Sequence, residues 1–143
     1  MKKIFMCSLM LTSLFFVACT KTTTVTSPPT NPNPIIGLWV GTYQIDNEAN
    51  LGSYYYSFSL FSDSTFVQQG GGSNGQIWTG IGTWSLKGTA WSATLSNTDI
   101  SSGPLTQVVT ATYDSVAGTL SHGVWRNTSG TSAAGTFSLK RVN

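Results

Sequence analysis

The chain has 143 residues, of which 40% are hydrophobic and only 8% are charged, and its formal net charge is +2. That charge provides no basic patch for nucleic acid, so we expect no nucleic-acid partner. Two cysteines and a single histidine also leave little material for a disulfide framework or a metal site.

The segment 1–18 has the layout of an export leader. Lys2 and Lys3 precede an apolar run that extends over residues 4–18. As a helix this run would span roughly 22 Å, which is short of the ~30 Å hydrocarbon core of a bilayer. We therefore expect a signal peptide that is cleaved rather than a helix that spans the membrane.

Phe16-Val17-Ala18-Cys19 ends the leader and resembles the processing box of bacterial lipoproteins. In that box a small residue precedes an invariant cysteine, and Phe16 stands where the family usually has leucine. The resemblance implies that Cys19 takes a diacylglycerol and that several acyl chains anchor the protein firmly. Under the sorting rule of enterobacterial lipoproteins, a residue other than aspartate after the cysteine, here Thr20, implies the outer membrane of the cell envelope, on either its periplasmic or its surface side. The alternatives are an ordinary secretory leader that is cut elsewhere, or a Cys19 that is simply buried.

Residues 19–34 form a segment between the leader and the rest of the chain. After Cys19 it consists mainly of threonine, serine, asparagine and four prolines. This composition disfavours helix and buried strand and predicts an extended, disordered linker. Cleavage would also remove Lys2, Lys3 and Cys7, which leaves a chain of near-neutral charge.

Residues 35–143 predict a single all-β domain, because apolar and polar side chains alternate along it, as in Trp91, Ala93 and Leu95. Short turn sequences such as Lys87-Gly88 join the predicted strands and indicate an up-and-down meander. Eight strands close into a small barrel that holds side chains or one ligand. A two-sheet sandwich is the alternative. The eight strands are predicted at 37–45, 53–61, 65–70, 77–86, 89–96, 107–114, 118–126 and 133–142.

Gly37-Leu38-Trp39 opens the first predicted strand, and Lys140-Arg141 closes the last. This pattern resembles that of lipocalins and, over 36–143, that of small bacterial lipoproteins with a lipocalin-like (calycin-type) domain. It implies that Trp39 plugs the barrel and that Arg141 lies across its ring, a cation–π contact worth ~1–2 kcal/mol. Avidin-type barrels also open on a Gly-x-Trp strand. The resemblance implies a fold and no activity.

Aromatic side chains are the candidates for contact with a ligand. Tyr54, Tyr55 and Tyr56 begin the second predicted strand, and alternation must turn at least one of them outward. Trp78 follows a glycine-rich loop, which favours a place at the barrel rim, and Trp91 is a further candidate. Such side chains close over a lipid or stack on a sugar face. The alternative is that they belong to the core.

No catalytic or metal site is predicted. His122 lies roughly 10–13 Å from Asp114 across their predicted hairpin, which is beyond hydrogen-bonding reach. Asp46 and Glu48 form the only acidic pair, which we interpret as a solvated loop rather than a weak calcium site. We therefore expect neither an enzyme nor a cofactor.

Two functions from different classes stay open. The first is a lipid-anchored barrel that binds a small apolar or amphipathic ligand in its lumen. The second is a structural or interaction module of the envelope, whose barrel is filled by its own side chains and which contacts glycan or protein. An apolar cavity of ~300 Å³ or more would favour the first.

Overall fold

The computed structural model describes residues 34–99 and 103–142. The expected signal peptide, the expected lipidation site Cys19 and all of the expected linker except Pro34 lie outside the described residues. What the sequence predicts for them stays a prediction.

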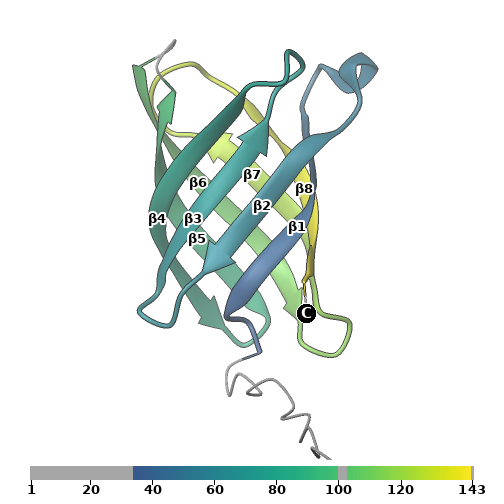
Figure 1. Cartoon of the computed structure of the whole chain (residues 1–143), viewed down its shortest axis with the longest axis vertical. Coiled ribbons are helices and arrows are strands. Elements are labelled where there is room, and N and C mark those ends of the chain that lie inside the picture. The colour runs from purple at the N-terminus through teal and green to yellow at the C-terminus, as the bar shows by residue number, and fades with distance from the viewer. Residues whose placement is uncertain (1–33, 100–102, 143) are drawn as a thin grey trace, which may run out of the picture. The chain divides into compact units, whose positions relative to one another are not determined.

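Eight antiparallel strands form a closed barrel in which each strand pairs with the next and the last pairs with the first (Figure 1). The all-β, up-and-down barrel is therefore confirmed, and the two-sheet sandwich is wrong. The barrel is compatible with a lipocalin-like fold. The strands are β1 (Gly37–Ile45), β2 (Tyr54–Leu60), β3 (Thr65–Gly71), β4 (Ile77–Lys87), β5 (Ala90–Asp99), β6 (Gly103–Asp114), β7 (Thr119–Asn127) and β8 (Ala134–Arg141), with a 3-10 turn η1 (Ala49–Leu51) after β1.

The hairpin of β5 and β6 is longer than the sequence predicts. Pairing continues from Leu95↔Gln107 through Asn97↔Leu105 to Asp99↔Gly103. The polar residues and Pro104 in this stretch disfavour a strand on propensity alone. The antiparallel partner strand holds them extended, so that tertiary pairing overrides the local preference.

The inward positions of the strands fill the middle of the barrel with aromatic rings. Tyr56 packs edge-on against Phe58 with ring centroids 4.9 Å apart, and Phe58 stacks on Trp91 at 5.3 Å. Phe137 lies 5.5 Å from both Tyr56 and Phe58. Such pairs each contribute about 0.5–1.5 kcal/mol beyond the area they bury. These rings leave the central lumen packed.

Glycines on the inner face make room for three of the large rings. Gly70 is the cross-strand partner of Trp78, and Gly123 is that of Phe137. A Cβ atom at either glycine would lie 2.5 Å from the facing ring. Gly135 is likewise the cross-strand partner of Trp125, and a Cβ atom there would lie 2.7 Å from the indole ring. Each ring therefore lies flat over a wall position that has no side chain.

One end of the barrel is closed by the segment that precedes β1. Ile35 is 1% exposed, and its carbonyl accepts a hydrogen bond of 2.8 Å from Nε1 of the fully buried Trp39. Tyr113 meets the Trp39 ring edge-on at 5.9 Å. The segment 34–36 is thus part of this floor, and Pro34 lies at the closed end, beside Gly118 and Arg141.

Arg141 also belongs to the floor. It is the cross-strand partner of Trp39. Its Nη2 donates to the Ile36 carbonyl at 3.0 Å, and its guanidinium lies beside Gly37. The ring contact that the structure shows for Trp39 is with Tyr113.

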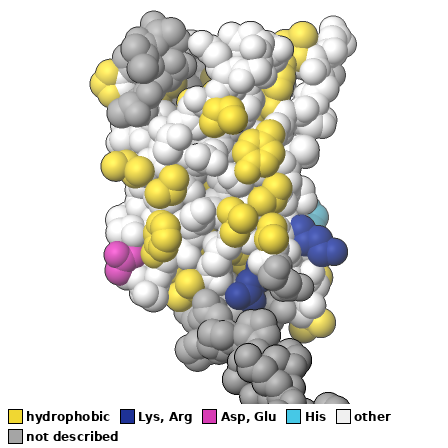
Figure 2. All heavy atoms as spheres, viewed as in Figure 1, with side chains coloured by type: hydrophobic (Ala, Val, Ile, Leu, Met, Phe, Trp, Pro, Cys, Tyr) yellow, Lys and Arg dark blue, Asp and Glu magenta, His cyan; other side chains and the backbone are white. Residues whose placement is uncertain are grey.

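The outer wall is rich in serine and threonine and carries few charges. Over β1 to β4 hydrophobic side chains are scattered on this wall, and the charged ones visible in that view lie near the closed end (Figure 2). Phe61, Ile77 and Ile81 are among the exposed hydrophobic residues.

We expect Gly123→Ala to lower the free energy of unfolding by about 1–3 kcal/mol, because the new methyl group overlaps the Phe137 ring. Chemical denaturation monitored by tryptophan fluorescence measures the change. Ser138→Ala, at an exposed outer position of β8, is the control and should be neutral. A Gly123→Ala protein as stable as the parent would show that the ring is not held against this glycine.

We expect Ile35→Ala to cost about 2–5 kcal/mol, because it empties a buried site in the floor. Ile81→Ala is the matched control, since Ile81 is 64% exposed on the outer wall, and it should change stability by no more than about 0.5 kcal/mol. Equal stabilities for the two variants, measured by the same denaturation, would mean that the domain does not need the segment before β1.

Candidate functional site

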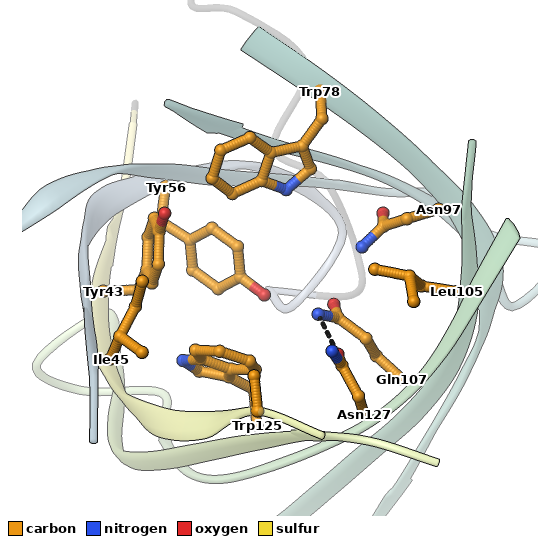
Figure 3. Close-up of a pocket in the computed structure, with 10 residues that line it drawn as sticks. Tyr43, Ile45, Tyr56, Trp78, Asn97, Leu105, Gln107, Trp125 and Asn127 are labelled. Atoms are coloured by element: carbon orange, nitrogen blue, oxygen red, sulfur yellow. Dashed lines mark hydrogen bonds between the residues drawn. The ribbon is translucent and has the colours of Figure 1, made fainter. Parts of the chain in front are cut away.

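A cavity of about 150 Å³ lies at the end of the barrel opposite the floor (Figure 3). The strands run alternately up and down, so the ends of β1, β5 and β7 meet the starts of β2, β4 and β6 at this mouth. The cavity is lined by Tyr43, Ile45, Tyr56, Trp78, Asn97, Leu105, Gln107, Trp125, Asn127 and Ala133.

Aromatic rings form one side of the cavity, with Tyr43 at their centre. Its ring lies 5.1 Å from Tyr56, 5.7 Å from Trp78 and 5.9 Å from Trp125. The planes of both indoles stand steeply to it, at 76° and 77°. The Tyr43 hydroxyl donates to the Gly71 carbonyl at 3.0 Å, and Nε1 of Trp125 donates to the Gln44 carbonyl at 3.2 Å. These bonds to the wall fix the rings in place.

Amide side chains form the opposite side, and the first pair is Gln107 with Asn127 (Figure 3). Asn127 Nδ2 donates to the Thr131 carbonyl at 2.6 Å, and Gln107 Nε2 donates to Asn127 Oδ1 at 2.8 Å. Gln107 Oε1 is buried and has no hydrogen-bond partner. The Gln107 side chain is only 8% exposed, so this acceptor has lost its water without a replacement in the protein.

The second pair is Gln68 with Asn97, both buried. Trp78 Nε1 and the Gly70 amide can only donate, so they orient the Gln68 amide with its oxygen toward them, at 3.1 and 3.2 Å. Gln68 then donates through nitrogen to Asn97 Oδ1 at 2.8 Å. The Asn97 amide nitrogen is left toward the cavity (Figure 3).

Three other buried polar atoms of the described residues also have no partner: Trp91 Nε1, Tyr113 Oη and Arg141 Nε. None of the three belongs to a residue that lines the cavity. Within residues 34–99 and 103–142, Gln107 Oε1 is thus the one buried, unpartnered side-chain atom that belongs to a residue lining this cavity.

The cavity lining is uncharged. Burial, and less strongly the nearby Tyr54 and Glu48, raises the pKa of Tyr43 well above its usual range. Burial likewise raises the pKa of Tyr56, with a smaller contribution from Tyr43. Both hydroxyls therefore stay neutral at any physiological pH. The site can offer aromatic faces and hydrogen bonds but no ionic contact from its lining.

The residues predicted from the sequence to contact a ligand lie in different parts of the structure. Tyr56 and Trp78 line the cavity, and Tyr54 packs against Tyr43 with ring centroids 5.4 Å apart. Tyr55 is exposed on the outer wall, and Trp91 stacks on Phe58 in the central core. Neither Tyr55 nor Trp91 lines the cavity.

Sequence reasoning missed Tyr43, Trp125 and the amides. The signal for Asn97 was present, because it continues the inward series of Trp91, Ala93 and Leu95 as a polar residue at a buried position. Gln107 stands in the same relation to Val109. A polar residue in phase with the buried face is a reasonable marker of a site, since burying it without a partner costs free energy.

The groups considered for catalysis or metal binding lie elsewhere. Asp114 Oδ1 accepts hydrogen bonds from the amides of Val116 and Ala117 and so shapes its own turn. His122 is exposed at an irregularity of β7, with φ of 52°. Within the described ranges, no three His, Cys, Asp or Glu side chains gather to hold a metal ion. In the same ranges, the structure has no helix with the length and hydropathy to cross a membrane.

We expect the free energy of unfolding to fall above about pH 10. The unfolded chain releases the Tyr56 proton there, while the folded barrel keeps it because its pKa is raised. Below that pH the Tyr56 hydroxyl is protonated in both the folded and the unfolded state, so it does not make the free energy of unfolding depend on pH. The slope for Tyr56 should reach about 1.4 kcal/mol per pH unit.

Denaturation of the parent and of Tyr56→Phe at about pH 8 and about pH 11 tests this prediction. The Tyr56→Phe protein should lose less stability over that range. Tyr55→Phe is the control, since Tyr55 is exposed on the outer wall, and it should follow the parent. Parallel losses in the parent and Tyr56→Phe would contradict the prediction.

Comparisons with known proteins found no match, so the geometry of the cavity is the basis on which we propose a function. No family model matches the chain, and neither a curated protein nor a solved structure does.

Proposed function

We propose that this chain is a lipid-anchored binding protein of the bacterial cell envelope, which holds a small, neutral, amphipathic molecule in the mouth of its barrel. The observation that carries the proposal is the cavity with aromatic rings on one side and oriented amides on the other. A barrel that served only as a scaffold would be expected to fill this layer with apolar side chains, as it does the layers below. Leaving a buried acceptor such as Gln107 Oε1 unpaired costs about 1–3 kcal/mol, which a bound donor would recover.

The position of the floor supports an anchored binder. Pro34 lies at the closed end, beside Gly118 and Arg141, opposite the cavity. If Cys19 is lipidated and the membrane is the outer membrane, the linker joins the membrane to the floor. Attachment through the floor would leave the mouth, at the other end of the barrel, clear of the tether.

A second candidate is the structural or interaction module. It is favoured by the packed central lumen and by the exposed hydrophobic side chains of the outer wall, among them Phe61 and Ile81 (Figure 2). The cavity is also smaller than the ~300 Å³ typical of drug-sized ligands. We prefer the binder because the module does not explain why the buried Gln107 Oε1 has no hydrogen-bond partner at the mouth.

We propose binding without catalysis. In the described ranges, Asp114 is used in a turn and His122 is exposed, and the cavity lining contains neither. The amides and tyrosine hydroxyls of the lining are suited to hydrogen bonding rather than to proton transfer near neutral pH.

Native mass spectrometry of the protein purified from its own source tests the proposal. We expect a small molecule to be retained by the parent. Leu105→Phe should release it, because Leu105 lines the cavity and a larger ring there fills it. Leu38→Phe is the matched control, since Leu38 is exposed on the outer wall, and it should retain the molecule.

Thermal unfolding of each variant verifies that the barrel is intact. A parent protein that carries no molecule, together with no difference between Leu105→Phe and Leu38→Phe in binding any added compound, would overturn the binding function. That result would favour the structural module.

A further inference from the structure

We infer that the ligand is one neutral sugar ring, a pyranose, taken either free or as the terminal unit of a glycan. This inference rests on the proposed binding function and names the class of ligand for the same cavity.

The size of the cavity limits the ligand to a single ring. A cavity of about 150 Å³ in a protein interior accepts one bare six-membered ring such as benzene, so a pyranose would insert only in part, with some of its hydroxyls at the open mouth. Beneath the cavity Tyr56 contacts Phe58 and Phe137, at 4.9 and 5.5 Å, so the lumen does not continue downward. A long alkyl chain therefore has no channel to enter, whereas further sugar units can extend out of the mouth.

The hydrogen bonds of Gln107 fix an acceptor in the cavity. The Thr131 carbonyl can only accept, so Asn127 must present nitrogen to it and oxygen to Gln107. Gln107 must then present nitrogen to Asn127. Its oxygen is left for the ligand, without ambiguity in the amide orientation. A ligand that completes the site has a hydrogen-bond donor here.

The hydrogen bonds of Gln68 similarly determine which atom of Asn97 is a donor toward the cavity. Trp78 Nε1 and the Gly70 amide can only donate, which leaves the Gln68 nitrogen for Asn97 Oδ1. The Asn97 nitrogen is left for the ligand. Because Asn97 pairs with Leu105 and Gln107 with Leu95, the two amides are diagonal neighbours on one inner face.

Neighbouring hydroxyls of a sugar ring meet both requirements. Each hydroxyl both donates and accepts. One can donate to Gln107 Oε1 while an adjacent one accepts from the Asn97 nitrogen. A hydrocarbon ring meets neither requirement, and a phenol offers only one hydroxyl for both.

The aromatic side of the cavity offers ring faces in more than one direction. Trp78 and Trp125 each stand steeply to Tyr43, at 76° and 77°. A pyranose directs its C–H groups to several sides and can contact two such faces together.

Charge excludes acidic sugars and other anions. No lysine or arginine lines the cavity, and Glu48 lies near enough to Tyr43 to raise its pKa. A carboxylate or phosphate would enter this site without a counter-ion, which is unfavourable. The ligand is therefore neutral.

Saturation-transfer NMR and tryptophan fluorescence with the processed, detergent-solubilised protein test the inference. The sugar probes are glucose, galactose, mannose and N-acetylglucosamine, and the flat-ring probes are phenol and indole. We expect at least one sugar to bind and to quench or shift the tryptophan emission. Gln107→Leu should weaken its binding by about tenfold, since it removes the acceptor and keeps the volume.

Gln69→Leu is the control, because Gln69 is exposed on the outer wall of β3, and it should bind the sugar as the parent does. Denaturation verifies that Gln107→Leu folds, and Leu105→Phe gives a second variant with a blocked cavity. Phenol or indole binding that Leu105→Phe abolishes, with no sugar bound, would overturn the sugar inference and keep the binding function. Equal sugar binding by Gln107→Leu and the parent would also overturn it. If no probe binds and the source protein retains no molecule, both proposals fail.

Discussion

Closure of eight strands into a ring is the constraint on which the rest of the structure depends. It fixes the width of the lumen, so each inward layer must supply a volume that fits. In the middle layers this is done by rings such as Phe58, Phe137 and Trp91. Where a ring is too large for its layer, the facing strand has a glycine, as Gly123 does opposite Phe137. The cavity lies at the one end where amides replace this packing.

The amides of the mouth are oriented by neighbouring groups that can only donate or can only accept a hydrogen bond. A carbonyl orients the pair that ends at Gln107, and two N–H groups orient the pair that ends at Asn97. The polarity of each pair is therefore set by the protein before any ligand arrives. Preorganised groups discriminate strongly, because a ligand with the wrong pattern leaves a buried group unpaired.

The sequence predicted the barrel well because its signals are local. Two-residue alternation and short turns identify strands and their order without knowledge of the partner. The cavity depends on the register between strands, which alternation does not specify. Trp78 and Trp91 both occupy inward positions, yet one lines the mouth and the other stacks on Phe58. Gln107 and Asn127 become a pair only when β6 lies beside β7 in the observed register. The N-terminal predictions concern residues outside the described ranges.

The two ends of the barrel differ in how fully they are packed, and this affects stability. The floor buries Ile35 and Trp39 and satisfies the Trp39 nitrogen through a backbone carbonyl, although Tyr113 Oη and Arg141 Nε have no partner there. The mouth keeps an empty volume and an unpaired acceptor, both of which cost free energy. Packing in the floor and central lumen offsets that cost. A ligand that fills the cavity and donates to Gln107 would remove it, so binding and stability are linked at the mouth. The affinity of such a site depends on how much of this cost a given ligand relieves, more than on the area it buries.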